Sequence, residues 1–172
     1  MNRSRQILFG KNDELKLEKH INVNDNAKEG IFRCRIIYED SVISVEFTPY
    51  FPAIIKTLKT VDAGSLVYDH KYLDRSSLIS LIDKTIADDI LIIRNGCITD
   101  TSFTNIIFSD GHRWLTPDTP LLPGTMRELL IRQGLIKTSR IKLNDIHNFT
   151  HFRLINSMLG NEGPLIPVSF II

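Results

Sequence analysis

The chain has 172 residues, of which 42% are hydrophobic and 24% are charged. This length allows one domain of ordinary size or two small lobes, and it is enough to bury a core. Because 21 lysines and arginines balance 20 aspartates and glutamates without a long basic run, nothing indicates an electrostatic surface for nucleic acid or membranes. We therefore expect a small-molecule partner.

Neither a membrane helix nor a secretory signal is expected from the sequence. No window reaches the roughly 18 apolar residues of a membrane span, and MNRSRQILFG lacks the apolar core of a signal peptide. A cytoplasmic protein is expected. The two cysteines, Cys34 and Cys97, lie far apart in strand-like segments, which argues against a disulfide framework or a metal knuckle. Both are expected to be buried thiols.

The first part of the chain, residues 1–62, is predicted to form a small lobe. Its opening segment, 3–21, is polar and compatible with a helix. Two runs rich in β-branched and aromatic residues follow at 31–38 and 42–50, and the polar tripeptide EDS between them predicts a β-hairpin. Proline and glycine residues within 51–70 mark the crossing to a second lobe.

The second, larger lobe, residues 63–172, opens with a helix predicted over 72–87. Apolar residues recur there at helical spacing, opposite a polar face that includes Asp83. Four short strands are predicted next, and the turn pairs NG and DG between them indicate an antiparallel meander. The four strands are DILIIRN (89–95), CITDT (97–101), TNIIFSD (104–110) and HRWLTP (112–117).

The remaining third of the chain combines one helix with further strands. A loop that enters a helix is predicted over 120–136, with Gly124 near its start and Gly134 after its last turn. Strands are predicted in SRIKL (139–143), FRLINSM (152–158) and PLIPVSFII (164–172).

Lys71, just ahead of the predicted helix 72–87, is the first candidate for chemistry. A solvated charge is the ordinary role of a lysine in a globular chain. A lysine amine can instead form a Schiff base with an aldehyde cofactor, when burial or a neighbouring cation favours its neutral form. The immediate neighbours of Lys71 do not decide between these roles.

Two further features have chemical potential. Asp100 ends a predicted strand and is either part of a polar turn or a carboxylate that pairs with a protonated ring nitrogen. The loop that delivers Gly124, Thr125 and Met126 to a helix start is either a plain cap or a phosphate site, because helix N-termini present free N–H groups.

Other candidates are set aside. His147 and His151 are four apart but lack the glutamate of HExxH, and the sequon of residues 148–150 has no meaning without secretion. No Rossmann, Walker or GxSxG pattern is present, and no metal site is predicted.

Taken in order, four segments resemble the successive motifs of the class IV aminotransferase family. These are pyridoxal-phosphate enzymes of fold type IV, which include branched-chain and D-amino acid aminotransferases and aminodeoxychorismate lyase. The resemblance covers roughly residues 65–170, and the first lobe matches more loosely. The segments are HKYLDRSSL, NGCITDTSFTNIIF, LTPDTPLLPGTMREL and INSMLGNEGPLIPV.

The resemblance implies an α+β fold, with a small α/β lobe and a larger β-barrel-like lobe with flanking helices. It also implies a homodimer that takes pyridoxal 5'-phosphate as cofactor and a small amino compound as substrate. Lys71 would form the Schiff base and transfer protons. Asp100 stands where the family usually has a glutamate facing the pyridine nitrogen. Gly124, Thr125 and Met126 match the family's GIT phosphate loop, in which Met126 offers only its backbone N–H.

The resemblance also assigns supporting residues. Ser157 lies near the family's last phosphate contact, while Arg75 and Asn105 are expected to line or brace the cofactor site. The family's opening strands, with HxxRLxxS and its phosphate-binding arginine, have no counterpart, since Arg3 and Arg5 do not occupy that position. We therefore expect a chain that is shortened at its N-terminus and lacks one phosphate anchor.

Three functions remain open. KYLDRS resembles the KxLNR form of aminodeoxychorismate lyases and D-amino acid aminotransferases, which favours a lyase of folate biosynthesis that converts 4-amino-4-deoxychorismate to 4-aminobenzoate and pyruvate. The first alternative is an aminotransferase acting on branched-chain or D-amino acids. The second alternative is a degenerate family member without activity.

Overall fold

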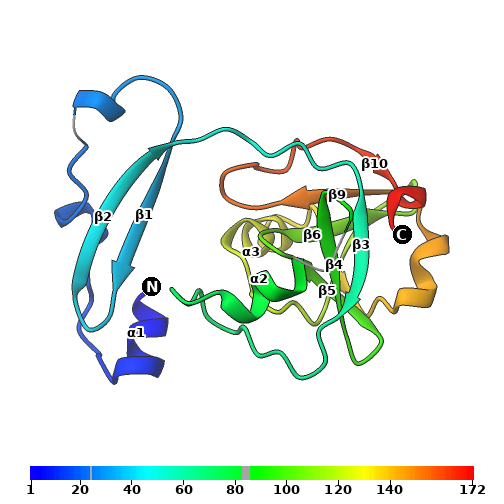
Figure 1. The fold of residues 1–172 in the computed structure, drawn as a ribbon, viewed down its shortest axis with the longest axis horizontal. Helices are drawn as coiled ribbons and strands as arrows, with labels where there is room; N and C mark the ends of the chain where they lie inside the picture. Colours follow the sequence, from blue (N-terminus) through cyan, green and yellow to red (C-terminus); the bar gives the residue numbers. More distant parts are fainter. Residues whose placement is uncertain (24, 83–85) are drawn as a thin grey trace. The chain divides into compact units, whose positions relative to one another are not determined.

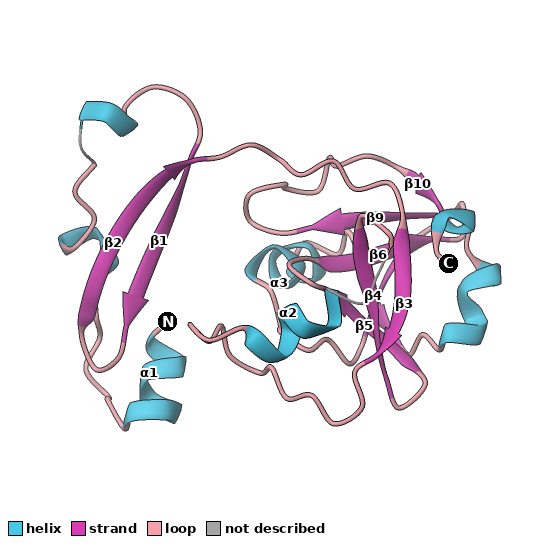
Figure 2. Cartoon of the chain, viewed as in Figure 1, coloured by secondary structure: helices cyan, strands magenta, loops and turns pink. Residues whose placement is uncertain are grey.

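The computed structural model describes residues 1–23, 25–82 and 86–172, which form two compact units, Met1–Pro52 and Ala53–Ile172 (Figures 1 and 2). The helices are α1 Asn2–Phe9, α2 Ser76–Ile82 and α3 Thr125–Arg132, and 3-10 helices lie at Leu17–Lys19, Asp25–Ala27, Leu143–Asn148 and Val168–Phe170. The strands are β1 Phe32–Tyr38, β2 Val42–Pro49, β3 Leu58–Asp62, β4 Asp89–Arg94, β5 Cys97–Thr101, β6 Asn105–Ser109, β7 Trp114–Pro117, β8 Lys137–Ser139, β9 His151–Ile155 and β10 Ile166–Pro167.

The first unit contains the predicted hairpin. β1 and β2 pair antiparallel as a two-stranded sheet, which confirms the prediction. The predicted helix 3–21 is shorter than expected, because the left-handed residue Gly10 ends α1 after eight residues. Cys34 in β1 is exposed, so the prediction of a buried thiol is wrong there, while Cys97 is buried as predicted. A two-stranded sheet provides little interior for side chains.

Arg5 organises the first unit. It is only 2% exposed, and it is the sole buried residue in the described part of this unit. Its guanidinium donates to the carbonyl oxygens of Asp13 (2.9 Å) and Asp40 (2.6 Å) and forms an ion pair of 3.0 Å with the Asp13 carboxylate. One arginine therefore joins α1 to the loop that follows it and to the hairpin turn.

The second unit contains two sheets. The three-stranded sheet has the order β3-β4-β5, and the five-stranded sheet has the order β10-β9-β6-β7-β8. Most strand pairs are antiparallel, while β3 with β4 and β7 with β8 are parallel. These pairs, together with the helices, confirm the α+β class.

The predicted single meander is wrong, because its four strands form two hairpins in different sheets. β4 pairs with β5 and β6 pairs with β7. The first hairpin has the expected turn, since Asn95 (φ 53°) and Gly96 (φ 72°) both adopt the positive φ that such turns require. Between the hairpins, the amide of Thr101 donates to the carbonyl of Thr104 (3.0 Å), and this tight turn carries the chain from one sheet to the other.

β4 is buried on both faces and connects two parts of the core. Leu91 and Ile93 belong to the larger apolar cluster, while Ile90 and Ile92 pack in a second cluster with Leu78 of α2. This explains why the DILII run has no polar alternation. α3 packs through Leu130 in a third cluster. α2 and α3 lie on one side of the strands of this unit, and the 3-10 helix Leu143–Asn148 lies on the other (Figure 1).

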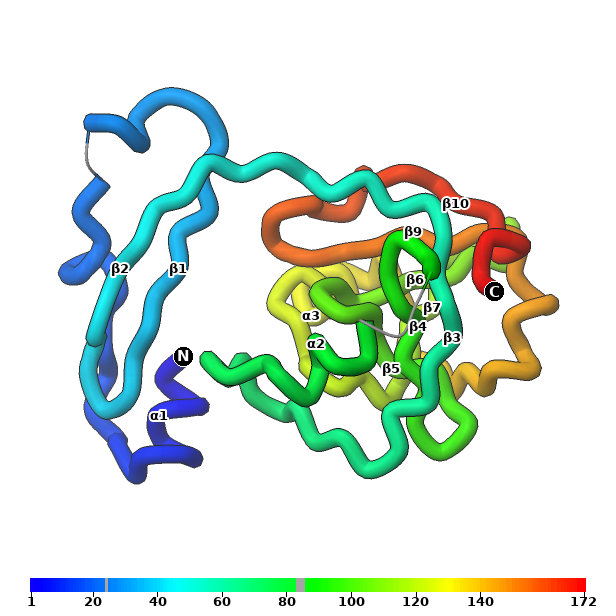
Figure 3. Tube along the Cα trace, in the orientation of Figure 1, coloured from blue at the N-terminus to red at the C-terminus, as the bar shows by residue number. Residues whose placement is uncertain are grey.

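Three predicted segments differ from the structure. The helix predicted over 72–87 begins only at Ser76, and Asp83 lies outside the described residues. The segment 139–143 is mostly not a strand, because β8 ends at Ser139. The segment 164–172 contains only the two-residue strand β10 and a 3-10 helix. Its last residue, Ile172, lies beside β3 and exchanges hydrogen bonds of 2.8 Å with Leu58 and Thr60 (Figure 3).

Candidate active site

Asp100 is a buried acid at the end of β5. Its side chain is 5% exposed, and each carboxylate oxygen accepts a hydrogen bond from the protein. Oδ1 accepts from Nδ2 of Asn105 (2.7 Å), and Oδ2 accepts from the backbone N–H of Leu122 (2.9 Å). Burial raises the pKa of Asp100 to about 6, although these two hydrogen bonds oppose the shift. The acid thus lies in a site that stabilises its proton or a positively charged partner.

Asn105, the first residue of β6, ties Asp100 to the loop that precedes α3. Its side-chain amide is buried and donates both to Asp100 and to the carbonyl oxygen of Leu122 (2.9 Å). The adjoining residue Gly124 packs directly on the same side chain, where a Cβ atom would lie 3.3 Å from the Cγ of Asn105. Residues from β5, β6 and this loop therefore form one connected group.

The N-terminus of α3 adjoins this group. Gly124 is its N-cap and has no side-chain cap, and the first intrahelical bond runs from Glu128 N–H to the Gly124 carbonyl (3.0 Å). The N–H groups of the first turn, beginning with Thr125 and Met126, therefore have no acceptor within the helix. The side chain of Met126 packs on the core cluster around Leu130, which leaves its backbone N–H as the polar group.

Two hydroxyl groups stand near this helix start. Oγ1 of Thr125 and Oγ of Ser157 lie 2.6 Å apart and share a hydrogen bond, although 32 residues separate them in the sequence. Both residues are exposed. Backbone N–H groups and hydroxyls at the positive end of a helix form a donor set that suits a phosphate.

Arg127 is a residue of this region that the sequence reasoning missed. It is 5% exposed, and it donates to the carbonyl of Pro117 (2.8 Å) and to the carboxylate of Glu128 (3.0 Å). Its positive charge also lowers the pKa of Asp100, more weakly than burial raises it. An arginine in the first turn opposes the helix dipole, and this mismatch was the only signal in the sequence.

Lys71 lies in the loop between β3 and α2, which Figure 2 shows as a segment without regular structure. The lysine is exposed, and it forms no hydrogen bond or ion pair within the described parts of the chain. The adjacent Tyr72 has several partners. Its ring lies 5.9 Å, between centroids, from the rings of Tyr68 and of His70, and its hydroxyl donates a hydrogen bond to Asp69 (2.9 Å). The backbone beside Lys71 is thus held by aromatic contacts.

Arg75 connects the end of this loop to the turn after Asp100. Its guanidinium donates to the carbonyl of Ser102 (2.7 Å), while its Nε atom is buried without a partner among the described residues. The carboxylate of Asp74 accepts from the N–H of Ser76 (2.8 Å), which forms an Asx turn just before α2. Arg75 therefore links the Lys71 loop to the β5–β6 turn.

The structure brings most of the predicted site residues into contact with one another or with their neighbours. Asp100, Asn105 and Gly124 form one connected group, and Thr125 contacts Ser157. In the part of the chain that the structure describes, no hydrogen bond or ion pair joins Lys71 to any of these residues.

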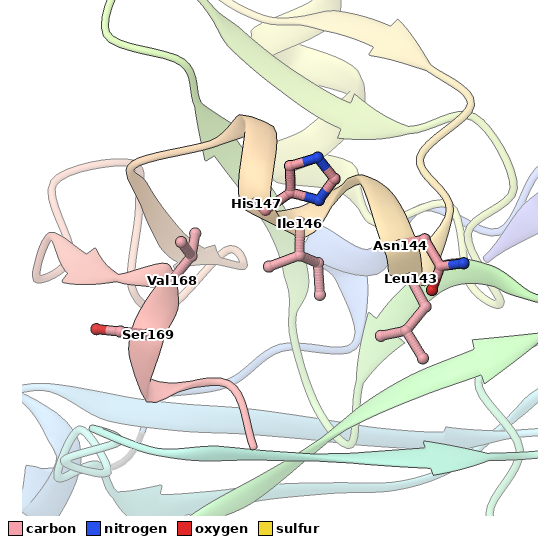
Figure 4. A pocket seen from close by; sticks show the side chains of 6 residues that line it. All are labelled: Leu143, Asn144, Ile146, His147, Val168 and Ser169. Atoms are coloured by element: carbon pink, nitrogen blue, oxygen red, sulfur yellow. The ribbon is translucent and has the colours of Figure 1, made fainter.

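A hollow of the surface lies elsewhere in the second unit. It has a volume of about 560 Å³ and is bounded by two 3-10 helices (Figure 4). None of its residues was predicted for the site, and it offers no buried charge, so we do not place the site there. The lining residues are Leu143, Asn144, Ile146, His147, Val168 and Ser169.

The described ranges contain neither a metal-binding cluster of side chains nor a helix that could cross a membrane. No group of three or more His, Cys, Asp or Glu side chains there is arranged to hold a metal ion. Within the same ranges, every helix is too short or too polar to cross a membrane.

The chain is similar to other proteins in its sequence and in its fold. Residues 44–166 match the family described as amino-transferase class IV. An uncharacterized protein of Haemophilus influenzae is 40% identical over 131 residues, which are 76% of this chain and 70% of that protein. A crystal structure from Haemophilus somnus, provisionally named a 4-amino-4-deoxychorismate lyase, is 32% identical, with a TM-score of 0.79 over 92% of this chain and 85% of its own.

A second crystal structure shares the fold. It comes from Mesorhizobium loti, is provisionally named an amino-acid aminotransferase, and is 23% identical, with a TM-score of 0.66 over 79% of this chain and 71% of its own. The architecture is therefore that of the fold type IV enzymes. The chain belongs to the amino-transferase class IV family.

Proposed function

We propose that this protein is a pyridoxal-phosphate enzyme that converts 4-amino-4-deoxychorismate to 4-aminobenzoate and pyruvate. The observation that carries the proposal is the buried acid Asp100, held in one group with the loop that begins α3. The 32% identity with the Haemophilus somnus protein over 92% of this chain supports the choice of a lyase.

The residues present fit this cofactor. Each oxygen of Asp100 accepts one hydrogen bond and keeps a second lone pair, so the carboxylate can still accept a hydrogen bond from the N–H of a protonated pyridine ring. The N–H groups of Thr125 and Met126, with the hydroxyls of Thr125 and Ser157, form a donor set for the phosphate. When bound, the cofactor supplies an electron sink for a carbanion next to the amino group.

The chain's own residues would then have distinct roles. Lys71 Nζ would hold the cofactor through its aldehyde until the substrate amine displaces the lysine, and the freed amine would then take the proton from the substrate carbon that carries the amino group. The same amine would return this proton to the enolpyruvyl group as its bond to the ring breaks, so that pyruvate leaves and the ring becomes aromatic. Arg75 holds the Lys71 loop against the Ser102 carbonyl.

A second candidate is an aminotransferase for branched-chain or D-amino acids, which the family description favours. Such an enzyme would use Lys71 and Asp100 in the same roles and would differ in the fate of the substrate. Pyruvate release from 4-amino-4-deoxychorismate, without an added amino acceptor, distinguishes the lyase. Transfer of the amino group from an amino acid to the cofactor distinguishes the transferase.

Cofactor binding is tested by mixing the protein with pyridoxal phosphate and recording its visible absorption. We expect the band of a lysine-bound aldehyde in the wild-type protein and its loss in Lys71→Ala. Lys59→Ala, which removes another exposed lysine from β3, should keep the band. Absence of the band in the wild-type protein, or its persistence in Lys71→Ala, would refute the proposal.

A further inference from the structure

The side chain of Asn105, and not the backbone conformation, requires a glycine at position 124. Its φ of −74° and ψ of 147° are values that any residue adopts. A Cβ atom at this position, however, would overlap Oδ1 of Asn105 and lie 3.3 Å from Cγ and 3.9 Å from Nδ2 of the same side chain. The space that a larger residue would need at position 124 is thus filled by one amide.

That amide has no freedom to move aside. Its Nδ2 donates to Oδ1 of Asp100 (2.7 Å) and to the carbonyl of Leu122 (2.9 Å). The N–H of Leu122 donates in turn to Oδ2 of Asp100 (2.9 Å), which closes a ring of three hydrogen bonds. Rotation of the Asn105 side chain would break two of these bonds inside the protein, where unpaired polar groups are costly.

We propose that Asn105 is a positioning residue, which fixes the Asp100 carboxylate and the start of α3 as a single unit. Gly124 is the residue of the α3 start that packs against the Asn105 side chain. The identity of the ligand rests on the proposed function, in which Asp100 would face the ring nitrogen of the cofactor and the start of α3 would face its phosphate. The packing of Gly124 against Asn105 involves only residues of the chain, so it can be tested in the cofactor-free protein.

The test is a double-mutant cycle on the unfolding equilibrium of the cofactor-free protein, measured by urea denaturation. In the wild-type background, Gly124→Ala overpacks the site, and we expect the unfolding constant to rise about tenfold or more. In an Asn105→Ala background the overlapping Oδ1 and the tightly placed Cγ are gone. There, Gly124→Ala should leave the unfolding constant unchanged or lower it roughly twofold to fivefold, because alanine restricts the unfolded chain more than glycine does.

The control background is Thr116→Val. Thr116 is fully buried and donates from Oγ1 to the carbonyl of Ile106 (3.0 Å), so its loss also removes a buried hydrogen bond. The Gly124→Ala effect should persist there, since side chains that do not touch add their effects. If Asn105→Ala does not fold, Asn105→Ser supplies the background. An undiminished Gly124→Ala effect in either Asn105 variant overturns the proposal.

A second readout follows the amide directly. The side-chain NH₂ resonance of Asn105 in ¹⁵N NMR spectra, assigned by its absence in Asn105→Ala, should shift toward the position of a solvated amide in Gly124→Ala. No movement of this resonance would contradict the proposal. Because neither measurement needs the cofactor, this proposal and cofactor binding can fail separately.

Discussion

Asp100 and Asn105 belong to different sheets, and a hydrogen bond of 2.7 Å from Nδ2 of Asn105 to Oδ1 of Asp100 joins them. The bond crosses from the last strand of the three-stranded sheet to the middle of the five-stranded one. The protonation state of Asp100 therefore affects a hydrogen bond between the two sheets of the second unit.

The first prediction concerns the pH dependence of stability. Burial raises the pKa of Asp100 from 3.8 to about 6, so the folded chain holds this proton more tightly than the unfolded chain. The stabilisation is complete below the unfolded pKa and is lost as the pH rises through about 6. The loss corresponds to roughly 3 kcal/mol.

The Asp100→Asn variant removes this titration. The unfolding free energy of the wild-type protein relative to the variant should therefore fall by roughly 2 to 3 kcal/mol between about pH 4 and pH 7, measured by urea denaturation of the cofactor-free protein. A flat difference for Asp100→Asn would contradict the prediction.

The second prediction concerns Asp89, the first residue of β4. This side chain is 2% exposed, and its Oδ2 has no hydrogen-bond partner among the described residues. Burial raises its pKa, against opposing hydrogen bonds that include one from Ser102. As with Asp100, stability is lost as the pH rises through the folded pKa. Asp89→Asn should therefore gain stability relative to the wild-type protein between acid and neutral pH, and a constant difference would count against this account.

The third prediction concerns the link between the Lys71 loop and the β5–β6 turn. Arg75→Met removes the 2.7 Å bond to the Ser102 carbonyl, and charge-assisted bonds of this kind contribute about 1.5 to 3 kcal/mol. We expect limited proteolysis between residues 63 and 75 to accelerate. The exposed Arg132→Met, at the end of α3, should change nothing. Equal cleavage rates in the two variants would show that Arg75 does not anchor the loop.

The fourth prediction concerns the first unit, whose only buried described residue is Arg5. Arg5→Met removes the donors that hold the carbonyls of Asp13 and Asp40. Amide hydrogen exchange in β1 and β2 should accelerate about tenfold or more, because each loss of 1.4 kcal/mol corresponds to a factor of ten. The exposed Arg3→Met should leave exchange unchanged. Unaltered exchange in Arg5→Met would remove Arg5 from this role.

Local patterns in the sequence predicted local structure well. The hairpin of β1 and β2, the NG turn at Asn95 and the glycine at the start of α3 follow from residue types within a few positions of one another. The crossing between sheets after β5 was missed, because pairing of β6 with β9 joins residues about fifty positions apart, and no nearby residue encodes it.

The residues of the candidate site were predictable from the sequence, but the contacts between them were not. Asp100, Gly124 and Asn105 were all named from the sequence, whereas the hydrogen bond and the packing that join them are set by tertiary structure. The role of Arg5 was missed for the same reason, since its partners are backbone carbonyls that any residue could supply.

The hydroxyls of Thr125 and Ser157 bond to each other at 2.6 Å in the chain without ligand. Thr125 is the first residue of α3, and Ser157 follows the end of β9, so this bond ties the start of the helix to the end of that strand. A substitution that displaces either segment would therefore separate the two hydroxyl oxygens.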